Sequence, residues 1–137
     1  MATAYVDSSA VLKLAVREPE TAALEAHLAS LDGLVASRLA VLECRRAVRR
    51  ASHVRVLQTV DQVLDALYLL DITQAILDEA AVAGPPLLRS LDAIHLATAL
   101  SIGDAELEVI TYDQPFADAA RANGLTVVQP GRRARSA

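Results

Sequence analysis

Short runs of apolar residues alternate along this chain with longer segments in which apolar residues recur every three or four positions. A short apolar run predicts a β-strand, and apolar residues with the longer period predict a helix with one buried face. The predicted strands cover residues 3–6, 34–36, 68–72, 108–111 and 125–128. The predicted helices cover about residues 8–14, 19–31, 38–51, 53–67, 73–83, 90–102 and 114–123. This alternation predicts an α/β fold with a central, mainly parallel β-sheet flanked by helices.

Polar residues at the starts of several predicted helices are expected to cap them. A side-chain oxygen at that position accepts a hydrogen bond from a free backbone N–H of the first turn. In the helix that starts near residue 90, we expect Leu91 and Ile94 to pack on the sheet. The expected capping residues are Ser8, Ser9, Thr73 and Ser90.

Length and composition predict one domain. The chain has 137 residues, of which 53% are hydrophobic, and a chain of this length builds its own core. We expect a single domain over residues 1–130 and a basic tail at residues 131–137, which we expect to be disordered. The single cysteine, Cys44, excludes an internal disulfide and fits a cytoplasmic protein. We expect no secretory signal and no membrane association, because no apolar run is long enough to span a bilayer.

The charge is unevenly distributed. The formal net charge is −4, yet residues 38–55 hold six arginines and one acid, Glu43. A local arginine patch can bind a phosphate backbone even on an acidic protein, although a solvated helix face explains the same pattern. The arginines that we assign to phosphate contacts are Arg45, Arg46, Arg49 and Arg50.

Two acids follow predicted strands. Asp7 ends the first strand, and Asp113 comes shortly after the fourth. Functional crevices of parallel sheets lie outside the carboxyl ends of the strands, so both side chains are expected in the same crevice. Taken alone, each acid could simply cap the helix that follows it.

Two further acids lie on partly apolar helix faces. Glu43 lies one helical turn after Leu39 and so borders the apolar face of its helix. An ion pair with Arg46, three residues later, is the simpler explanation for an acid at this position. Asp92 lies on the apolar stripe of the segment LLRSLDAIHLATAL. Its simpler explanation is a favourable interaction of a first-turn acid with the helix dipole.

A shared cation explains all four acids together. Carboxylates that are brought close repel each other and raise one another's pKa, and a divalent ion reverses this effect. Because the candidate ligands are all oxygen atoms, Mg²⁺ or Mn²⁺ fits them better than zinc.

Four segments resemble the signature blocks of a known family. They are AYVDSSAVLKL, LAVLECRRAV, LRSLDAIHLATAL and VITYDQPFADAARANGLTVV, in this order. Together they resemble the PIN domain, and more narrowly the VapC-type toxins of type II toxin–antitoxin systems, over residues 4–130. The resemblance implies a Rossmann-like fold and an endoribonuclease that depends on Mg²⁺ or Mn²⁺. It also implies a cognate antitoxin that inhibits the enzyme, an RNA substrate and a homodimer.

The resemblance also assigns residues. It places the catalytic, metal-binding acids of the family at Asp7, Glu43, Asp92 and Asp113. Asp118 lies one turn further along its helix, where it could contact a metal ion through water. Ser8 and Thr111 match small hydroxyl positions that support the carboxylates. His95 is interpreted as a supporting or packing residue, because the family pattern does not require it.

Other functional classes fit less well. A haloacid-dehalogenase-like phosphatase needs a second aspartate two residues after Asp7, where this chain has Ser9, and it needs a lysine late in the chain. A receiver domain needs such a lysine as well, but the only lysine is Lys13. The glycine-rich motifs of dinucleotide-binding and P-loop proteins are absent. The remaining alternative is a catalytically inactive PIN-like module that binds RNA or a protein.

Overall fold

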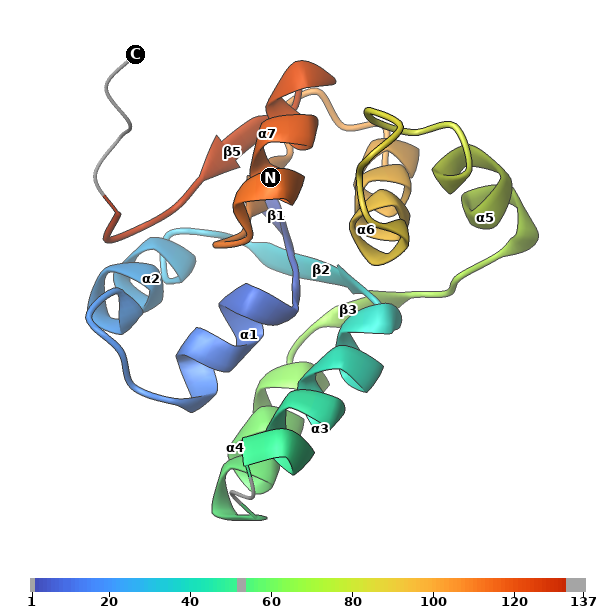
Figure 1. Cartoon of the computed structure of the whole chain (residues 1–137). Coiled ribbons are helices and arrows are strands. Elements are labelled where there is room, and N and C mark those ends of the chain that lie inside the picture. The colour runs from blue at the N-terminus through green and yellow to red at the C-terminus, as the bar shows by residue number, and fades with distance from the viewer. Residues whose placement is uncertain (1, 52–53, 133–137) are drawn as a thin grey trace.

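The core of the structure is a five-stranded parallel β-sheet, seen in Figure 1. The computed structural model describes residues 2–51 and 54–132. The strands are β1 (Thr3–Val6), β2 (Gly33–Ser37), β3 (Tyr68–Leu70), β4 (Glu108–Ile110) and β5 (Thr126–Val128). They lie in the order β3-β2-β1-β4-β5, and every neighbouring pair is parallel. The predicted α/β fold with a central parallel sheet is therefore confirmed.

Helices connect the strands and cover both faces of the sheet. The described helices are α1 (Ser8–Ala15), α2 (Thr21–Leu28), α3 (Leu39–Ala51), α4 (Val54–Asp65), α5 (Gln74–Ala80), α6 (Ser90–Ser101) and α7 (Gln114–Ala122). Figure 1 shows α1 to α4 on one side of the sheet and α5 to α7 on the other. The predicted start of α4 at residue 53 lies outside the described residues, as do residues 133–137 of the predicted tail.

The strand order indicates where on the sheet a ligand would bind. From β1 the chain proceeds outward to β2 and β3, and it then returns to the other side of β1 to form β4 and β5. The reversal lies between β1 and β4, and ligands of parallel sheets bind at the carboxyl ends of strands at such a point. Asp7 directly follows β1, and Thr111 to Asp113 directly follow β4.

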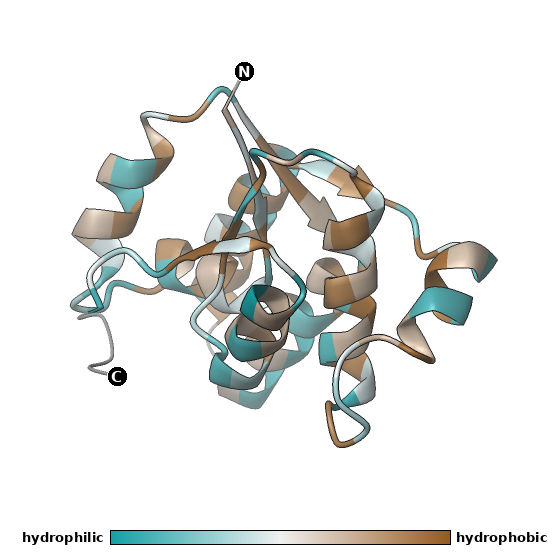
Figure 2. Ribbon diagram, turned by 90° about the horizontal axis from the view of Figure 1, so that it is seen from above, coloured by the Kyte–Doolittle hydropathy of each residue, from teal (hydrophilic) through white to brown (hydrophobic). Residues whose placement is uncertain are grey.

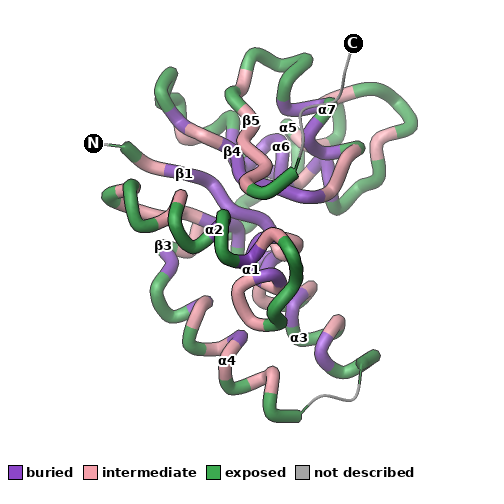
Figure 3. Tube along the Cα trace, turned by 90° about the vertical axis from the view of Figure 1, so that its left-hand side faces the viewer, coloured by how far each residue is buried: buried purple, intermediate pink, exposed green. Residues whose placement is uncertain are grey.

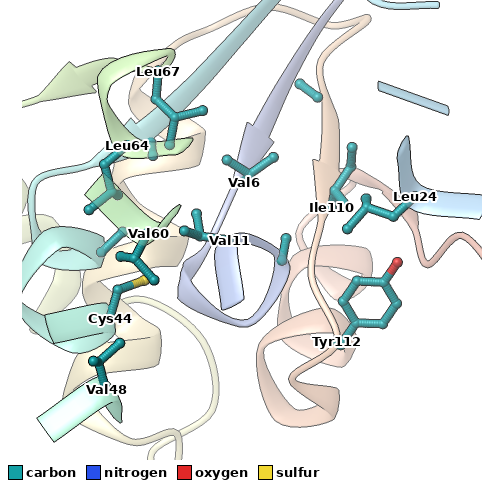
Figure 4. Packing of buried hydrophobic residues seen from close by; sticks show 14 residues of the cluster. Val6, Val11, Leu24, Cys44, Val48, Val60, Leu64, Leu67, Ile110 and Tyr112 are labelled. Atoms are coloured by element: carbon teal, nitrogen blue, oxygen red, sulfur yellow. The ribbon is translucent and has the colours of Figure 1, made fainter. Parts of the chain in front are cut away.

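Alternate residues of the central strands enter two separate cores. Ala4 and Val6 belong to the core that β1 shares with α1, α3 and α4, whereas Tyr5 belongs to the core under α6 and α7. Figure 4 shows Val6 and Val11 in the first core together with residues of α3 and α4. Figure 3 shows that β1 is buried over most of its length. Packing on both faces of the sheet therefore fixes the end of β1, which Asp7 directly follows.

The helix starts differ in part from the predicted ones. Thr73 caps α5 as predicted, because its side chain accepts a hydrogen bond from the backbone of Ile76. The N-cap of α1 is Asp7 rather than a serine, and its carboxylate accepts a hydrogen bond from the backbone of Ala10. The N-cap of α6 is Arg89, whose side chain makes no capping hydrogen bond, so the predicted cap at Ser90 is wrong.

The buried face of α6 also differs from the predicted one. Leu91 is 48% exposed, whereas Leu96 and Ala99 are buried against Tyr5 and Val109 of the sheet. The prediction that Leu91 packs on the sheet is therefore wrong. The helix is rotated so that Asp92 and the following turn face inward.

Hydrophilic and hydrophobic residues are interspersed along the helices, as Figure 2 shows, in agreement with the predicted periodicity. Helices α3 and α4 pack on each other and extend away from the sheet (Figure 1). Among the residues described, none of the helices has the length and apolar character needed to cross a membrane.

Candidate active site

Asp7 is held at the carboxyl end of β1 by a set of hydrogen bonds. Its side chain is buried, with the residue only 3% exposed. Ser9 Oγ donates to Oδ1 at 2.6 Å, and the backbone N–H of Ala10 donates to the same oxygen at 3.2 Å. Thr111 Oγ1 donates to Oδ2. Burial raises the pKa of Asp7, while the charge of His95 and these hydrogen bonds oppose the rise.

The hydroxyl groups of Ser9 and Thr111 join the ends of β1 and β4. Ser9 Oγ accepts the backbone N–H of Tyr112 at 2.8 Å, and Thr111 Oγ1 accepts that of Asp113 at 3.0 Å. Thr111 therefore lies where the sequence predicted a supporting hydroxyl. The serine hydroxyl group that contacts Asp7 belongs to Ser9, not to Ser8 as predicted. The backbone carbonyl oxygen of Ser8 accepts a hydrogen bond from Cys44 Sγ at 3.8 Å.

Asp92 and Asp113 form a second unit of the site. Asp92 lies in the first turn of α6, and Asp113 precedes α7. The guanidinium group of Arg89 contacts both, with Nη2 at 3.3 Å from Asp92 Oδ2 and 3.4 Å from Asp113 Oδ1. The arginine lies three residues before Asp92, a spacing at which oppositely charged side chains meet on a helix. This spacing is the signal that could have revealed Arg89 in the sequence.

The two carboxylates of the Asp92–Asp113 unit share one positive charge, that of Arg89, which does not neutralise both. Burial and the neighbouring Asp113 carboxyl raise the pKa of Asp92 to about 7, although Arg89 opposes the rise. The other carboxylate oxygen, Oδ2 of Asp113, is buried and has no hydrogen-bond partner among the described residues. A buried carboxylate oxygen without a donor is costly, so this unit favours an additional positive charge.

Glu43 and His95 form a third unit. Glu43 lies on the second turn of α3, and its Oε1 is 2.6 Å from Nε2 of His95 on α6. Nδ1 of the same imidazole lies 2.6 Å from the hydroxyl oxygen of Tyr5 on β1. Burial by itself lowers the pKa of His95, but the hydrogen bond and charge of Glu43 raise it, and the charges of Asp7 and Asp92 add to this effect. His95 thus lies within electrostatic reach of three of the four predicted acids.

The structure brings the four predicted acids to one edge of the sheet as separate units. No three His, Cys, Asp or Glu side chains in the two described ranges, 2–51 and 54–132, are grouped as a metal-binding cluster. Asp118 lies on the exposed face of α7, where its Oδ1 accepts a hydrogen bond from Gln114 and pairs with Arg121 at 3.7 Å. These contacts tie Asp118 to its own helix rather than to the other acids.

A divalent cation fits the Asp92–Asp113 unit by its donor chemistry. The unit offers carboxylate oxygens, which hard cations such as Mg²⁺ and Mn²⁺ prefer. One of these oxygens, Asp113 Oδ2, is buried and has no partner within residues 2–51 and 54–132. Arg89 shows that the two carboxylates can share a positive charge. The residues present therefore fit a metal ion at this position.

The arginines of α3 are exposed as a patch on the helix that carries Glu43. Arg46, Arg49 and Arg50 point to solvent, and Arg45 makes an exposed ion pair with Asp61 of α4 at 3.4 Å. Exposed ion pairs of this kind contribute little stability. These guanidinium groups are therefore accessible to an anionic ligand.

The chain is similar to proteins of one family. The family model of the PIN domain matches residues 4–122. Ribonuclease VapC46 of Mycobacterium tuberculosis is 42% identical over 130 residues, which cover 95% of this chain and 99% of that protein.

Solved structures show the same fold. VapC20 of Mycobacterium tuberculosis, described as a toxin that cleaves the sarcin–ricin loop, matches with a TM-score of 0.74 at 16% identity, over 93% of this chain and 99% of that chain. A toxin–antitoxin complex from Klebsiella pneumoniae matches with a TM-score of 0.68 at 24% identity, over 93% of this chain and 97% of that chain.

Proposed function

Because the chain belongs to the PIN-domain family and within it to the VapC group, we propose that it is an endoribonuclease toxin that hydrolyses RNA with Mg²⁺ or Mn²⁺. The name of the relative, ribonuclease VapC46, supports the nuclease activity. The observation that carries the metal-dependent part is the Asp92–Asp113 unit. It combines a raised pKa at Asp92 with a buried oxygen of Asp113 that has no partner in the part of the chain that the structure describes.

The four acids have complementary tasks in this proposal. Asp92 and Asp113 would hold the metal ion at the position described above, and the family resemblance assigns Asp7 and Glu43 to the same metal-binding set. When bound, a divalent ion lowers the pKa of a coordinated water and offsets the charge that develops on the phosphate. Ser9 and Thr111 keep the Asp7 carboxylate in one orientation through hydrogen bonds to both of its oxygens. A fixed carboxylate loses no further conformational freedom during the reaction, which favours catalysis.

RNA binding is assigned to the exposed arginines of α3. These arginines lie on the same helix as Glu43, and in this proposal they contact the phosphates that flank the scissile bond of the RNA. Contacts between arginines and phosphates release counterions, so binding is expected to weaken steeply with salt. The assigned residues are Arg45, Arg46, Arg49 and Arg50.

The proposed protein partner is a cognate antitoxin. The similarity of the fold to the toxin–antitoxin complex from Klebsiella pneumoniae supports this assignment. An antitoxin that inserts a basic side chain between Asp92 and Asp113 would occupy the position that the cation needs. We also propose a homodimer, for which the exposed apolar residues Leu42 and Val54 of α3 and α4 offer contact surface.

The proposal is tested by the RNA products of the purified protein. Cleavage is expected to stop when the metal is chelated and to resume when Mg²⁺ or Mn²⁺ is restored. Attack by a water molecule leaves a 5′-phosphate and a 3′-hydroxyl, and 2′,3′-cyclic phosphate ends would contradict the mechanism. A protein that binds RNA but does not cleave it with either ion would be the inactive PIN-like module.

A further inference from the structure

We propose that Tyr5 and His95 position the carboxylate of Glu43 for catalysis, through one chain of hydrogen bonds that crosses the buried interior. The proposal deepens the proposed function, because it rests on Glu43 acting in the nuclease site. The chain joins three elements, since Tyr5 lies on β1, His95 on α6 and Glu43 on α3.

The imidazole of His95 is fixed on all sides. His95 is 2% exposed, and both of its ring nitrogens have a partner at 2.6 Å. Its ring packs 5.7 Å from the ring of Phe116 and 5.9 Å from that of Tyr5, measured between centroids. A ring held in this way has one orientation, so the direction of its Nε2–H bond is fixed as well.

The hydrogen-bond chemistry assigns the protons. An ionised carboxylate only accepts hydrogen bonds, so the proton between Glu43 Oε1 and His95 Nε2 belongs to Nε2. Nδ1 donates to the Tyr5 hydroxyl oxygen when the imidazole is charged and accepts from the Tyr5 hydroxyl group when it is neutral, so Nε2 carries the proton toward Glu43 in both states. Tyr5 is fully buried, and its hydroxyl group therefore sets the orientation of the ring from the interior.

Glu43 depends on such a partner more than Asp7 does. Its side chain is 22% exposed, and Oε1 receives its hydrogen bond from His95. By contrast, Asp7 receives hydrogen bonds on both of its oxygens. A long side chain without a partner would sample several rotamers, and its ordering would add to the barrier of the reaction. His95 is thus a positioning residue that acts through Glu43.

Two substitutions at position 95 separate positioning from packing. The amide nitrogen of glutamine can occupy the place of Nε2 and donate to Glu43, whereas the shorter asparagine reaches only the place of Nδ1 near Tyr5. His95→Asn is therefore expected to lower the rate of single-turnover RNA cleavage by about 10–100-fold, the usual effect of losing the residue that orients a metal-site ligand. His95→Gln is expected to retain most of the activity. Equal losses in both variants, in proportion to their losses in stability, would show a packing role and overturn the proposal.

A readout that does not depend on activity uses nitrogen NMR of the metal-free protein. Long-range ¹H–¹⁵N spectra report which ring nitrogen is protonated, and the spectrum of His95→Gln identifies the signals of His95. We expect a proton on Nε2 that exchanges slowly with solvent, and faster exchange of this proton in Glu43→Ala. An unprotonated Nε2 would overturn the proposal, because Glu43 would then lack its donor.

Glu43→Gln distinguishes failure of this proposal from failure of the proposed function. If Glu43→Gln cleaves RNA as fast as the unchanged protein, Glu43 has no catalytic task and the proposed site is wrong at this residue. If Glu43→Gln is inactive but His95→Asn is fully active, the site stands and the positioning role is wrong. The proposal predicts that both variants lose activity and that their effects do not add in the double variant.

Discussion

The guanidinium Nη2 of Arg89 lies 3.3 Å from Oδ2 of Asp92, across the first turn of α6. The same nitrogen lies 3.4 Å from Oδ1 of Asp113, so one positive charge is shared by two carboxylates. The pKa of Asp92 is nevertheless raised to about 7, chiefly by burial and then by Asp113. A single arginine therefore offsets only part of the negative charge at this edge of the sheet.

Arg89→Gln is expected to destabilise the metal-free protein and to increase its stabilisation by Mg²⁺. The variant removes the charge that lies between Asp92 and Asp113, so a metal ion relieves more repulsion than in the unchanged protein. The loss in the free energy of unfolding is expected to be modest, about 1 kcal/mol or less, because the Arg89 side chain is 72% exposed.

The measurement is the melting temperature in a chelator and in millimolar Mg²⁺. Arg121→Gln is the matched control, because Arg121 forms an exposed pair with Asp118 on α7. An equal metal-induced shift in Arg89→Gln and in the unchanged protein would contradict the shared-charge interpretation.

The pH dependence of stability without metal follows from the pKa of Asp92, which is about 7 in the folded protein. An unfolded aspartate has a pKa of about 3.9. Between these values the folded protein binds more protons than the unfolded chain does, so the free energy of unfolding falls as the pH rises.

Asp92→Asn removes this titration and serves as the comparison. Denaturant unfolding in a chelator, from about pH 5 to about pH 8, is expected to show the unchanged protein losing stability relative to the variant. A relative gain with rising pH would mean that the pKa of Asp92 is not raised.

Thr111→Val is expected to destabilise the protein and to raise the pKa of Asp7 further. Valine has nearly the shape of threonine but cannot donate to Oδ2 of Asp7, which is buried. Loss of one donor to a buried polar group costs about 1–3 kcal/mol. Thr126→Val on the exposed side of β5 is the control, and chemical denaturation is the measurement. If the two variants lose equal stability, the hydroxyl of Thr111 does not support Asp7.

The double substitution of Arg46 and Arg49 by glutamine is expected to weaken RNA binding and to reduce its salt dependence. Each lost phosphate contact lowers the slope of log affinity against log salt by about 0.7 for single-stranded RNA. The measurement is a salt titration of RNA binding in an Asp92→Asn background, in which cleavage is expected to be absent. Arg17→Gln, at an exposed pair with Glu25 near α2, is the control. An unchanged slope would show that RNA follows another path over the surface.

Most of the fold could be predicted from the sequence, because local patterns decide it. Short apolar runs located the five strands that the structure describes, the longer apolar period located its seven helices, and their alternation predicted the parallel sheet. The N-cap of α6 and the exposure of Leu91 could not be predicted in this way. Leu91 is more apolar than Asp92, yet Asp92 is the buried one, because the packing of Leu96 and Ala99 fixes the rotation of the helix.

The candidate site could be predicted as a set of acids but not as a network. Asp7 and Asp113 were located from the strand ends, and Asp92 from its apolar surroundings. Ser9 lies only two residues from Asp7, but His95 contacts Glu43 because α3 and α6 pack close together in space. One sequence contains no signal for such contacts between distant elements, so the contacts of His95 with Glu43 and Tyr5 emerge only in the structure.

The central claim, that a carboxylate-bound metal ion drives RNA cleavage, is tested most directly with Asp92→Asn. The substitution removes one charge at nearly constant volume, so the fold is expected to persist, as circular dichroism and melting would show. Single-turnover cleavage of RNA in saturating Mg²⁺ is expected to slow by more than about 100-fold, because a metal ligand is lost from the reaction centre. A folded Asp92→Asn protein that cleaves RNA at the rate of the unchanged protein would contradict the account.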